Sequence, residues 1–272
     1  MIPIKTFFKV FALTFFIIAC ESEESTPTPN PRILNLQTTG DSANELLSAK
    51  THQSLVLELV SVKGFEPSKE AVENLKDFIE KRTFKPNGIK LVQRSIESTN
   101  KEKLTIQQID SIEQKNRTQL STPSEHAVFI YFSDATAKPS DDETDMHEGH
   151  MDNNIVLGSA YRNTSIVVYE NTLRNLTSPI QNEKRRKDIL TQIETFTLQH
   201  EFCHLLGLVN LGTRLQSQHE DVDENGIPNR HCNVKGCLMQ ANALFESDLM
   251  GSIRVLELDP LCIKDLQANG GR

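Results

Sequence analysis

The sequence predicts an α/β fold, because strand-like and helix-like segments alternate through its first half. The chain has 272 residues, 37% of them hydrophobic, which suffices for one sizeable core or for one core and a small lobe. A long helical pattern then leads into a C-terminal segment rich in glycine and turn residues. We therefore expect a sheet with helices in an N-terminal part, followed by a small loop-rich C-terminal part.

Residues 1–19 are typical of a signal peptide. Lys5 and Lys9 flank the start of an apolar run, residues 7–19, which is too short to span a bilayer as a mature helix. The run ends in Ile-Ile-Ala-Cys, which resembles the lipobox of bacterial lipoproteins, where the cysteine is lipidated. We expect lipidation at Cys20 and a membrane-anchored lipoprotein; the alternative is an ordinary secretory signal with a chance cysteine.

Residues 20–50 predict an acidic, proline-rich tether and an irregular lead-in. The acids that follow Cys20 resemble the export signal of surface lipoproteins in Bacteroidetes-type bacteria, so we expect an outer-membrane lipoprotein of the cell envelope, exposed at the surface. Disulfides are permitted there. The net charge of -8 argues against nucleic acid as a partner.

Five segments alternate after the tether. Residues 55–62 are apolar and β-branched, and residues 67–82 start with proline and carry one apolar helical face. Residues 89–96 alternate as a strand, and residues 104–117 show helical spacing. Residues 127–132 are continuously apolar, as in a strand covered on both faces.

An acidic loop, residues 138–154, interrupts this order. It carries His147 and His150, whose spacing could bind a metal, although an exposed acidic loop with adventitious histidines is the simpler interpretation. Two short strands follow at residues 157–161 and 165–169. The second of them is a candidate edge strand that could align an extended peptide.

The longest helical pattern covers residues 184–206 and ends before Gly207. Near its end stands His-Glu-Phe-Cys-His, the pattern HExxH. Because residues i and i+4 share one helical face, His200 and His204 can reach one zinc ion at about 2.0–2.1 Å. Glu201 can then act as general base toward a metal-activated water. The alternative is a pair of core histidines, which would leave Glu201 buried without a partner.

The longer string HEFCHLLGLVN resembles the metzincin signature HExxHxxGxxH, in which a third histidine completes the metal site. Here the last position is Asn210, and a neutral amide is a poor zinc ligand. The third ligand must therefore come from elsewhere in the chain.

A second string, residues 231–239, reads HCxxxxCxM and resembles the corresponding segment of archaemetzincins. The resemblance covers residues 200–239, with an insertion between its two halves. It implies a metzincin-like fold with a twisted mixed sheet, His231 as third zinc ligand, and Met239 in the Met-turn below the metal. His219 is the alternative third ligand, because it lies nearer in sequence to the helix.

Archaemetzincins also hold a second, structural zinc with four cysteines. This chain offers Cys232, Cys237 and Cys262, with Asp265 where the fourth cysteine would fall. A zinc site with these four ligands and a disulfide remain open as alternatives. Cys203, on the core side of the long helix, is expected to be inert.

The insertion contains a string like the start of a calcium loop, with Asp221, Asp223 and Asn225 as candidate ligands. Its twelfth position is Cys232 where such loops carry glutamate. A turn rich in Asp, Asn and Gly is the alternative.

We therefore predict a zinc metallopeptidase, a hydrolase of peptide or protein substrates, formed by residues 51–272. Its N-terminal subdomain covers residues 51–207 and its C-terminal subdomain residues 208–272. The alternative from another class is a surface-anchored binding lipoprotein with a structural, non-catalytic metal site. A glutamate ligand at Glu220 or Glu224 is a third, weaker alternative, because loop residues surround both positions.

Overall fold

The computed structural model describes residues 30, 32–138, 155–223, 225–241 and 256–272. The signal peptide, Cys20 and the start of the tether lie outside these residues, as do His147, His150 and Glu224. The sequence also shows a helix-like pattern at residues 244–256, and most of it lies outside the described residues as well. The remainder forms one compact unit, Pro31–Arg272.

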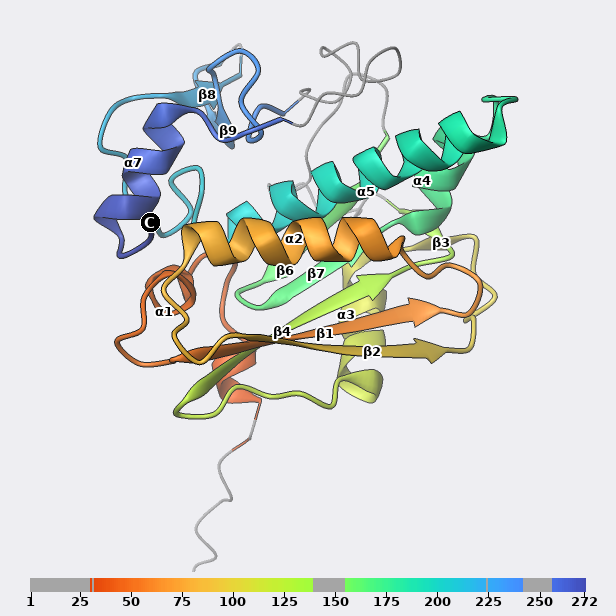
Figure 1. The fold of residues 1–272 in the computed structure, drawn as a ribbon, viewed down its shortest axis with the longest axis horizontal. Helices are drawn as coiled ribbons and strands as arrows, with labels where there is room; N and C mark the ends of the chain where they lie inside the picture. The colour runs from red at the N-terminus through yellow and green to blue at the C-terminus, as the bar shows by residue number, and fades with distance from the viewer. Residues whose placement is uncertain (1–29, 31, 139–154, 224, 242–255) are drawn as a thin grey trace, which may run out of the picture. The chain divides into compact units, whose positions relative to one another are not determined.

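A five-stranded mixed sheet lies at the centre of this unit, with strand order β2-β1-β4-β7-β6 (Figure 1). The strands are β1 (Ser54–Val62), β2 (Ile89–Ile96), β4 (Glu125–Phe132), β6 (Gly158–Arg162) and β7 (Ser165–Val168). The first four in the order are parallel, and β6 runs antiparallel to β7 at one edge. The predicted α/β fold with a mixed sheet is thus confirmed.

The predicted edge strand is wrong. Residues 165–168 form β7, which lies between β4 and β6, so β6 is the edge strand. The reason is that β7 is buried along its whole length and pairs with β4, while the tight turn after β6 places that strand outermost. A strand buried on both faces belongs inside a sheet.

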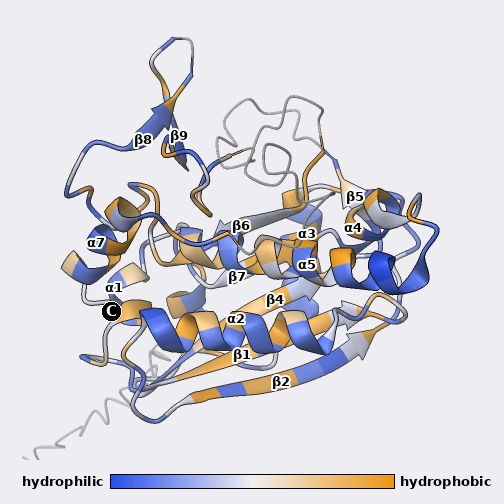
Figure 2. Cartoon of the chain, turned by 45° about the horizontal axis from the view of Figure 1, so that its top comes forward, coloured by the Kyte–Doolittle hydropathy of each residue, from blue (hydrophilic) through white to orange (hydrophobic). Residues whose placement is uncertain are grey.

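Helices cover both faces of the sheet. Helices α2 (Lys69–Arg82), α4 (Glu170–Thr177) and α5 (Glu183–Leu205) lie on one side, and α3 (Ile106–Asn116) lies on the other (Figures 1 and 2). The prediction for α3 started two residues too early. Leu104 belongs instead to the short strand β3 (Lys103–Leu104), paired with β5 (Thr136–Ala137), and Thr105 caps α3 in a capping box.

Alternate side chains of β1 point into two hydrophobic cores. Leu55, Leu57 and Leu59 pack with α2 and α5, whereas Val60 and Val62 pack with α3. Burial on both faces explains the near-continuous apolar runs of β1 and β4. The end of α5 therefore rests on a sheet that is held from both sides.

The lead-in before residue 51 packs on the sheet where it is described. It contains a 3-10 turn, η1 (Ile33–Asn35), and a short helix, α1 (Ala43–Leu47). The Asn35 amide donates to the Ser121 hydroxyl at 2.9 Å, and the Thr39 hydroxyl donates to the Ala160 carbonyl at 3.0 Å. The second bond fastens the lead-in to edge strand β6.

The C-terminal part is loop-rich, as expected. Its described residues form a two-stranded hairpin, β8 (Glu220–Val222) with β9 (Pro228–Cys232), and the helix α7 (Pro260–Ala268). Among the described residues, no helix is both long enough and apolar enough to cross a membrane.

Candidate metal centres

The end of α5 places His200 and His204 one helical turn apart in a buried position. The helix ends at Leu205, and Gly207 follows with a φ of +83°. A Cβ at Gly207 would lie 2.5 Å from the backbone nitrogen of Thr213, so only glycine fits this turn. The turn leads the chain away from the helix and toward the β8–β9 hairpin.

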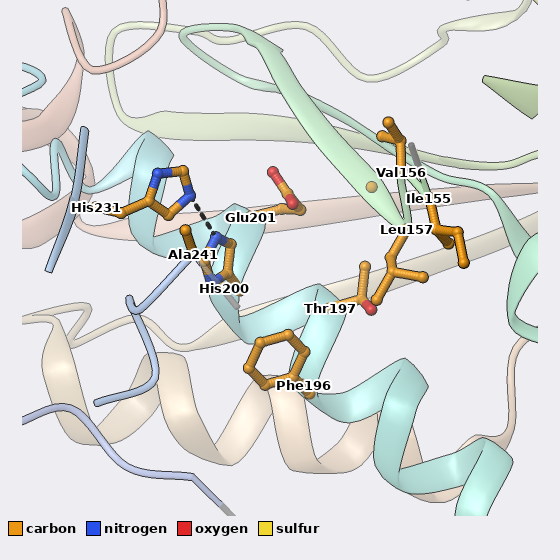
Figure 3. Close-up of a pocket in the computed structure, with 10 residues that line it drawn as sticks. Ile155, Val156, Leu157, Phe196, Thr197, His200, Glu201, His231 and Ala241 are labelled. Carbon is orange, nitrogen blue, oxygen red and sulfur yellow. Dashed lines mark hydrogen bonds between the residues drawn. The ribbon is translucent and has the colours of Figure 1, made fainter. Parts of the chain in front are cut away.

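His231, near the end of β9, joins these two histidines. One ring nitrogen of each residue lies within 4.8 Å of those of the other two. The Nε2 atoms of His200 and His231 are 3.3 Å apart (Figure 3). The histidine group is therefore His200, His204 and His231.

All three rings are oriented by the main chain. Their Nδ1 atoms lie 2.9, 2.8 and 2.7 Å from carbonyl oxygens, in the pairs His200–Leu238, His204–Leu208 and His231–Asn229. A carbonyl only accepts, so each Nδ1 carries the proton and each Nε2 of the neutral ring keeps its lone pair.

Burial keeps the rings of His200 and His231 neutral. It lowers the pKa of His200 to about 3, with His231 alongside as a second cause, and it also lowers the pKa of His231. Converging lone pairs repel one another unless a cation lies between them. Three neutral imidazoles oriented in this way fit a zinc ion.

Glu201 is buried beside the histidine group. One of its carboxyl oxygens accepts the backbone N–H of Ala160 at 2.9 Å. Burial raises the pKa of Glu201 to about 8, against the opposing effect of that hydrogen bond. Glu201, His200 and His231 line one cavity of about 30 Å³ together with apolar side chains such as Leu157 (Figure 3).

Gly158 gives Glu201 its space. A Cβ at this position would lie 2.9 Å from Cγ of Glu201 and 2.8 Å from Cγ2 of Thr197. Neither Gly158 nor Ala160 was predicted as a site residue, and Ala160 offers no side-chain signal because it acts through its backbone. A glycine inside a strand pattern is nonetheless a sign of close approach by another group.

His219 lies in a second group, away from the histidine group. Its Nδ1 is 3.4 Å from Sγ of Cys232, and the two residues cluster with Asp259 and Cys262. Its Nε2 lies 2.8 Å from a carboxyl oxygen of Asp265. Asp265 thus binds the Nε2 side of the His219 ring, and the Nδ1 side of the ring faces the thiols.

Cys237 belongs to the same place. Its sulfur lies 3.8 Å from that of Cys262, and both are free thiols, as are Cys203 and Cys232. Hydrogen bonds from the Cys232 and Cys262 thiols lower the pKa of Cys237 to about 5. We call Cys232, Cys237, Cys262 and His219 the cysteine group. Burial raises the pKa of Cys203, which favours an inert thiol there.

One chain segment, residues 231–239, serves both groups. His231 is followed by Cys232, and Cys237 is followed by Leu238, whose carbonyl orients His200. The N–H of Cys232 donates to the carbonyl of Met239 at 2.8 Å, which closes the segment into a loop. Met239 is fully buried; its role below a metal stays a prediction.

The expected calcium ligands bind groups of the chain itself. One carboxyl oxygen of Asp223 accepts the backbone N–H groups of Asn225 and Ile227 at 2.9 and 2.7 Å. The Asp221 carboxylate accepts the side-chain amide of Asn229 at 2.7 Å. The contacts of Asp223 have the form of an Asx-type turn, and that of Asp221 joins two side chains across the hairpin.

A third group, Glu45, His52 and His126, lies near the start of β1 and β4. Lys85 is next to it and donates to the His52 carbonyl at 2.8 Å. Burial, and then the charge of Lys85 among other causes, lowers the pKa of both histidines. The buried ammonium group of Lys85 next to this group of side chains disfavours a metal cation there.

No protein-family model and no curated protein match the sequence. The fold is similar to that of archaemetzincin from Methanopyrus kandleri, with 16% identity and a TM-score of 0.47, over 80% of this chain and 96% of that chain. It is also similar to a zinc-dependent peptidase from Methanocorpusculum labreanum, with 13% identity and a TM-score of 0.45, over 77% and 99% of the two chains. At this low identity and TM-score, the similarity concerns the fold alone.

Proposed function

We propose that this protein is a zinc-dependent peptidase whose metal ligands are His200, His204 and His231. The carrying observation is the orientation of the three rings, because every Nδ1 lies at a main-chain carbonyl while ring nitrogens of all three converge within 4.8 Å of one another. An acid that is not part of this group, Glu201, lies next to it. A purely structural site needs no such carboxylate.

Glu201 is the proposed general base. The Ala160 N–H holds one oxygen of its carboxyl group, so the other can face the cavity and take a proton from water. The same carboxyl group would then deliver that proton to the leaving amine. When bound, zinc would supply Lewis acidity toward the peptide carbonyl and lower the pKa of water.

Edge strand β6 is the proposed platform for the substrate. Within the described residues β6 pairs with no strand other than β7, and the N–H and carbonyl of its Ala160 bind Glu201 and Thr39. An extended peptide can add to such an edge through main-chain hydrogen bonds at positions other than Ala160. This replaces the expectation that residues 165–169 would serve that purpose.

The cysteine group is proposed to hold a second, structural zinc through Cys232, Cys237, Cys262 and His219. The Nδ1 side of His219 faces the thiols while Asp265 binds its Nε2, an arrangement in which a carboxylate orients a metal-binding histidine. A closed set of sulfur and nitrogen donors is typical of structural zinc. A disulfide between Cys237 and Cys262 is the alternative, and zinc counting under reducing and oxidising conditions separates the two.

We further propose that the chain is a lipoprotein of the bacterial cell envelope, with residues 1–19 as signal peptide and Cys20 as the lipidated residue. The support is the sequence pattern alone. Mass spectrometry of the native protein should find an acylated N-terminal Cys20. A mature start further along the chain, without acyl groups, would refute the proposal.

The test of the proposed function is Glu201→Gln. The amide can still accept the Ala160 N–H but cannot take a proton, so we expect zinc to stay bound while peptide hydrolysis falls by about 10²–10⁴-fold. Glu194→Gln is the matched control, since Glu194 is a buried acid on the same helix whose carboxylate accepts the Ser68 N–H. Near-normal hydrolysis by Glu201→Gln would refute the mechanism. A chain that binds zinc at the three histidines without any turnover would favour the binding lipoprotein.

A further inference from the structure

We propose that Asn210 and Glu220 are positioning residues, which hold His231 in place to receive the metal. The inference rests on the proposed zinc site and concerns how this chain brings its third ligand to that site. His231 is separated from His204 by a long loop and the β8–β9 hairpin. Something must therefore fix the hairpin against the end of α5.

Asn210 makes the first contact of this network. It ends the string HEFCHLLGLVN and has a φ of +57°, a conformation that Asn tolerates better than most residues. Its side-chain amide donates to one carboxyl oxygen of Glu220 at 2.9 Å. Asn210, at the position of the third histidine in the metzincin signature, thus binds β8, the strand that pairs with β9.

Glu220 continues the contact to the ligand strand. Its side chain is almost fully buried, and its other carboxyl oxygen accepts Nη1 of Arg230 at 3.2 Å. Burying a carboxylate is unfavourable unless it is paired and hydrogen-bonded, and Asn210 and Arg230 supply both. The Glu220 carboxylate therefore holds the side chains of Asn210 and Arg230 next to each other.

Arg230 is the residue directly before His231. It has a φ of +64°, which is strained for a non-glycine residue, and its carbonyl accepts the N–H of Val209 at 3.2 Å. The guanidinium also lies 3.4 Å from the Asn210 carbonyl. The backbone turn at Arg230 is thus held from the α5 end by main-chain and side-chain contacts together.

A second set of hydrogen bonds orients the imidazole ring of His231. Asp221, next to Glu220, accepts the side-chain amide of Asn229, and the Asn229 carbonyl accepts Nδ1–H of His231. Two successive acids of β8 therefore hold the two residues that precede the ligand. The first sets the backbone turn and the second sets the ring orientation.

These contacts hold His231 in its metal-binding position before the metal binds. Metal binding then need not order a long loop, whose ordering would otherwise weaken affinity. Loss of an outer contact of a metal ligand weakens binding by about 10–100-fold. We expect the same range for loss of the Asn210–Glu220 contact.

The test exchanges the two partners of that contact. Asn210→Asp places two carboxylates face to face, and we expect the affinity for Zn²⁺ at the histidine group to fall by about 10–100-fold. Adding Glu220→Gln restores an amide–carboxylate pair with donor and acceptor exchanged, so the double variant should recover most of the loss. Asp223→Asn, in the same hairpin but outside the network, should leave the affinity unchanged.

Affinity is measured by competition of Zn²⁺ with a chromophoric chelator. The His200→Ala variant reports the zinc bound elsewhere, so the histidine group can be read by difference. Unchanged affinity in Asn210→Asp overturns the inference. Equal loss in the single and double variants does so too, because a general defect in folding would not be repaired by Glu220→Gln.

These results separate the inference from the proposed function. If the unaltered chain binds no Zn²⁺ that His200→Ala removes, the proposed zinc site itself fails, and this inference fails with it. If the site binds Zn²⁺ and hydrolyses peptides while Asn210→Asp behaves as the unaltered chain does, only the positioning role is wrong.

Discussion

The histidine group and the cysteine group share residues 231–239, yet they differ in their surroundings. The histidines of the first group are 5–7% exposed, and two of them, His200 and His231, border a cavity that Glu201 also lines. The donors of the second group, His219 included, are 0–1% exposed. A site that retains an opening suits catalysis, and a closed one suits structure.

The difference shows how one short segment can carry two kinds of site. The segment turns so that the side chains of Cys232 and Cys237 face α7, while His231 and the Leu238 carbonyl face α5. The closed group can therefore stabilise the turn that shapes the open one. We expect changes in the two groups to have different consequences.

The largest expected effect separates the two candidate third ligands. His231→Ala should weaken zinc binding at the histidine group by orders of magnitude, since a direct ligand is lost, and should abolish hydrolysis. His219→Ala should leave that zinc in place and remove the metal of the cysteine group. Zinc counting and competition titration measure both. If His219→Ala strips the histidine group and His231→Ala does not, the two assignments are exchanged.

A second expected effect concerns Glu170 on α4, which packs against α5, the helix that carries the open site. Burial and the neighbouring Glu194 raise the pKa of Glu170 from 4.5 to about 8, against the opposing ion pair with Arg174. The folded chain thus binds a proton that the unfolded chain has released above pH 4.5, so stability is greatest below that pH and is lost as the pH rises to about 8. The loss should be on the order of a few kcal/mol.

Glu170→Gln should flatten this dependence, because the amide keeps the Arg174 contact and has no charge to bury. Thermal or urea unfolding between pH 4 and pH 9 measures it, with about equal stability of the two proteins at the acidic end. A steeper loss in the variant would contradict the assignment. The result also defines the pH range in which the two metal groups can be compared without unfolding α5.

The smallest expected effect is local to the open site. Gly158→Ala adds a Cβ that crowds Glu201 and Thr197, and overpacking of this kind costs about 1–3 kcal/mol. We expect peptide hydrolysis to fall about tenfold or more while zinc affinity at both groups changes little. Gly64→Ala is a control for glycine replacement, since a Cβ there meets nothing within 4 Å, although its positive φ adds some strain. Equal activity of Gly158→Ala and the unaltered chain would show that Glu201 has room to move.

The elements with strong local patterns could be predicted from the sequence alone. The strands at β1, β2 and β4 and the long helix α5 follow from hydrophobic spacing, which depends only on near neighbours. The spacing of His200 and His204 follows from the helix, since residues four apart share one face. These features need no knowledge of the rest of the chain.

The contacts between distant segments could not be predicted in this way, because they depend on how the whole chain packs. The closure entropy of a loop changes little with its length, so sequence distance could not choose between His219 and His231 as neighbours of His200. The pairing of β8 with β9 placed them in different groups, and only the folded chain put Asp265 behind His219. Likewise, the order of β6 and β7 in the sheet depends on which of the two pairs with β4. Because β7 does so, β6 is outermost and its Ala160 backbone lies at Glu201. Such contacts join residues without any shared local pattern, and the packing of the whole core selects them.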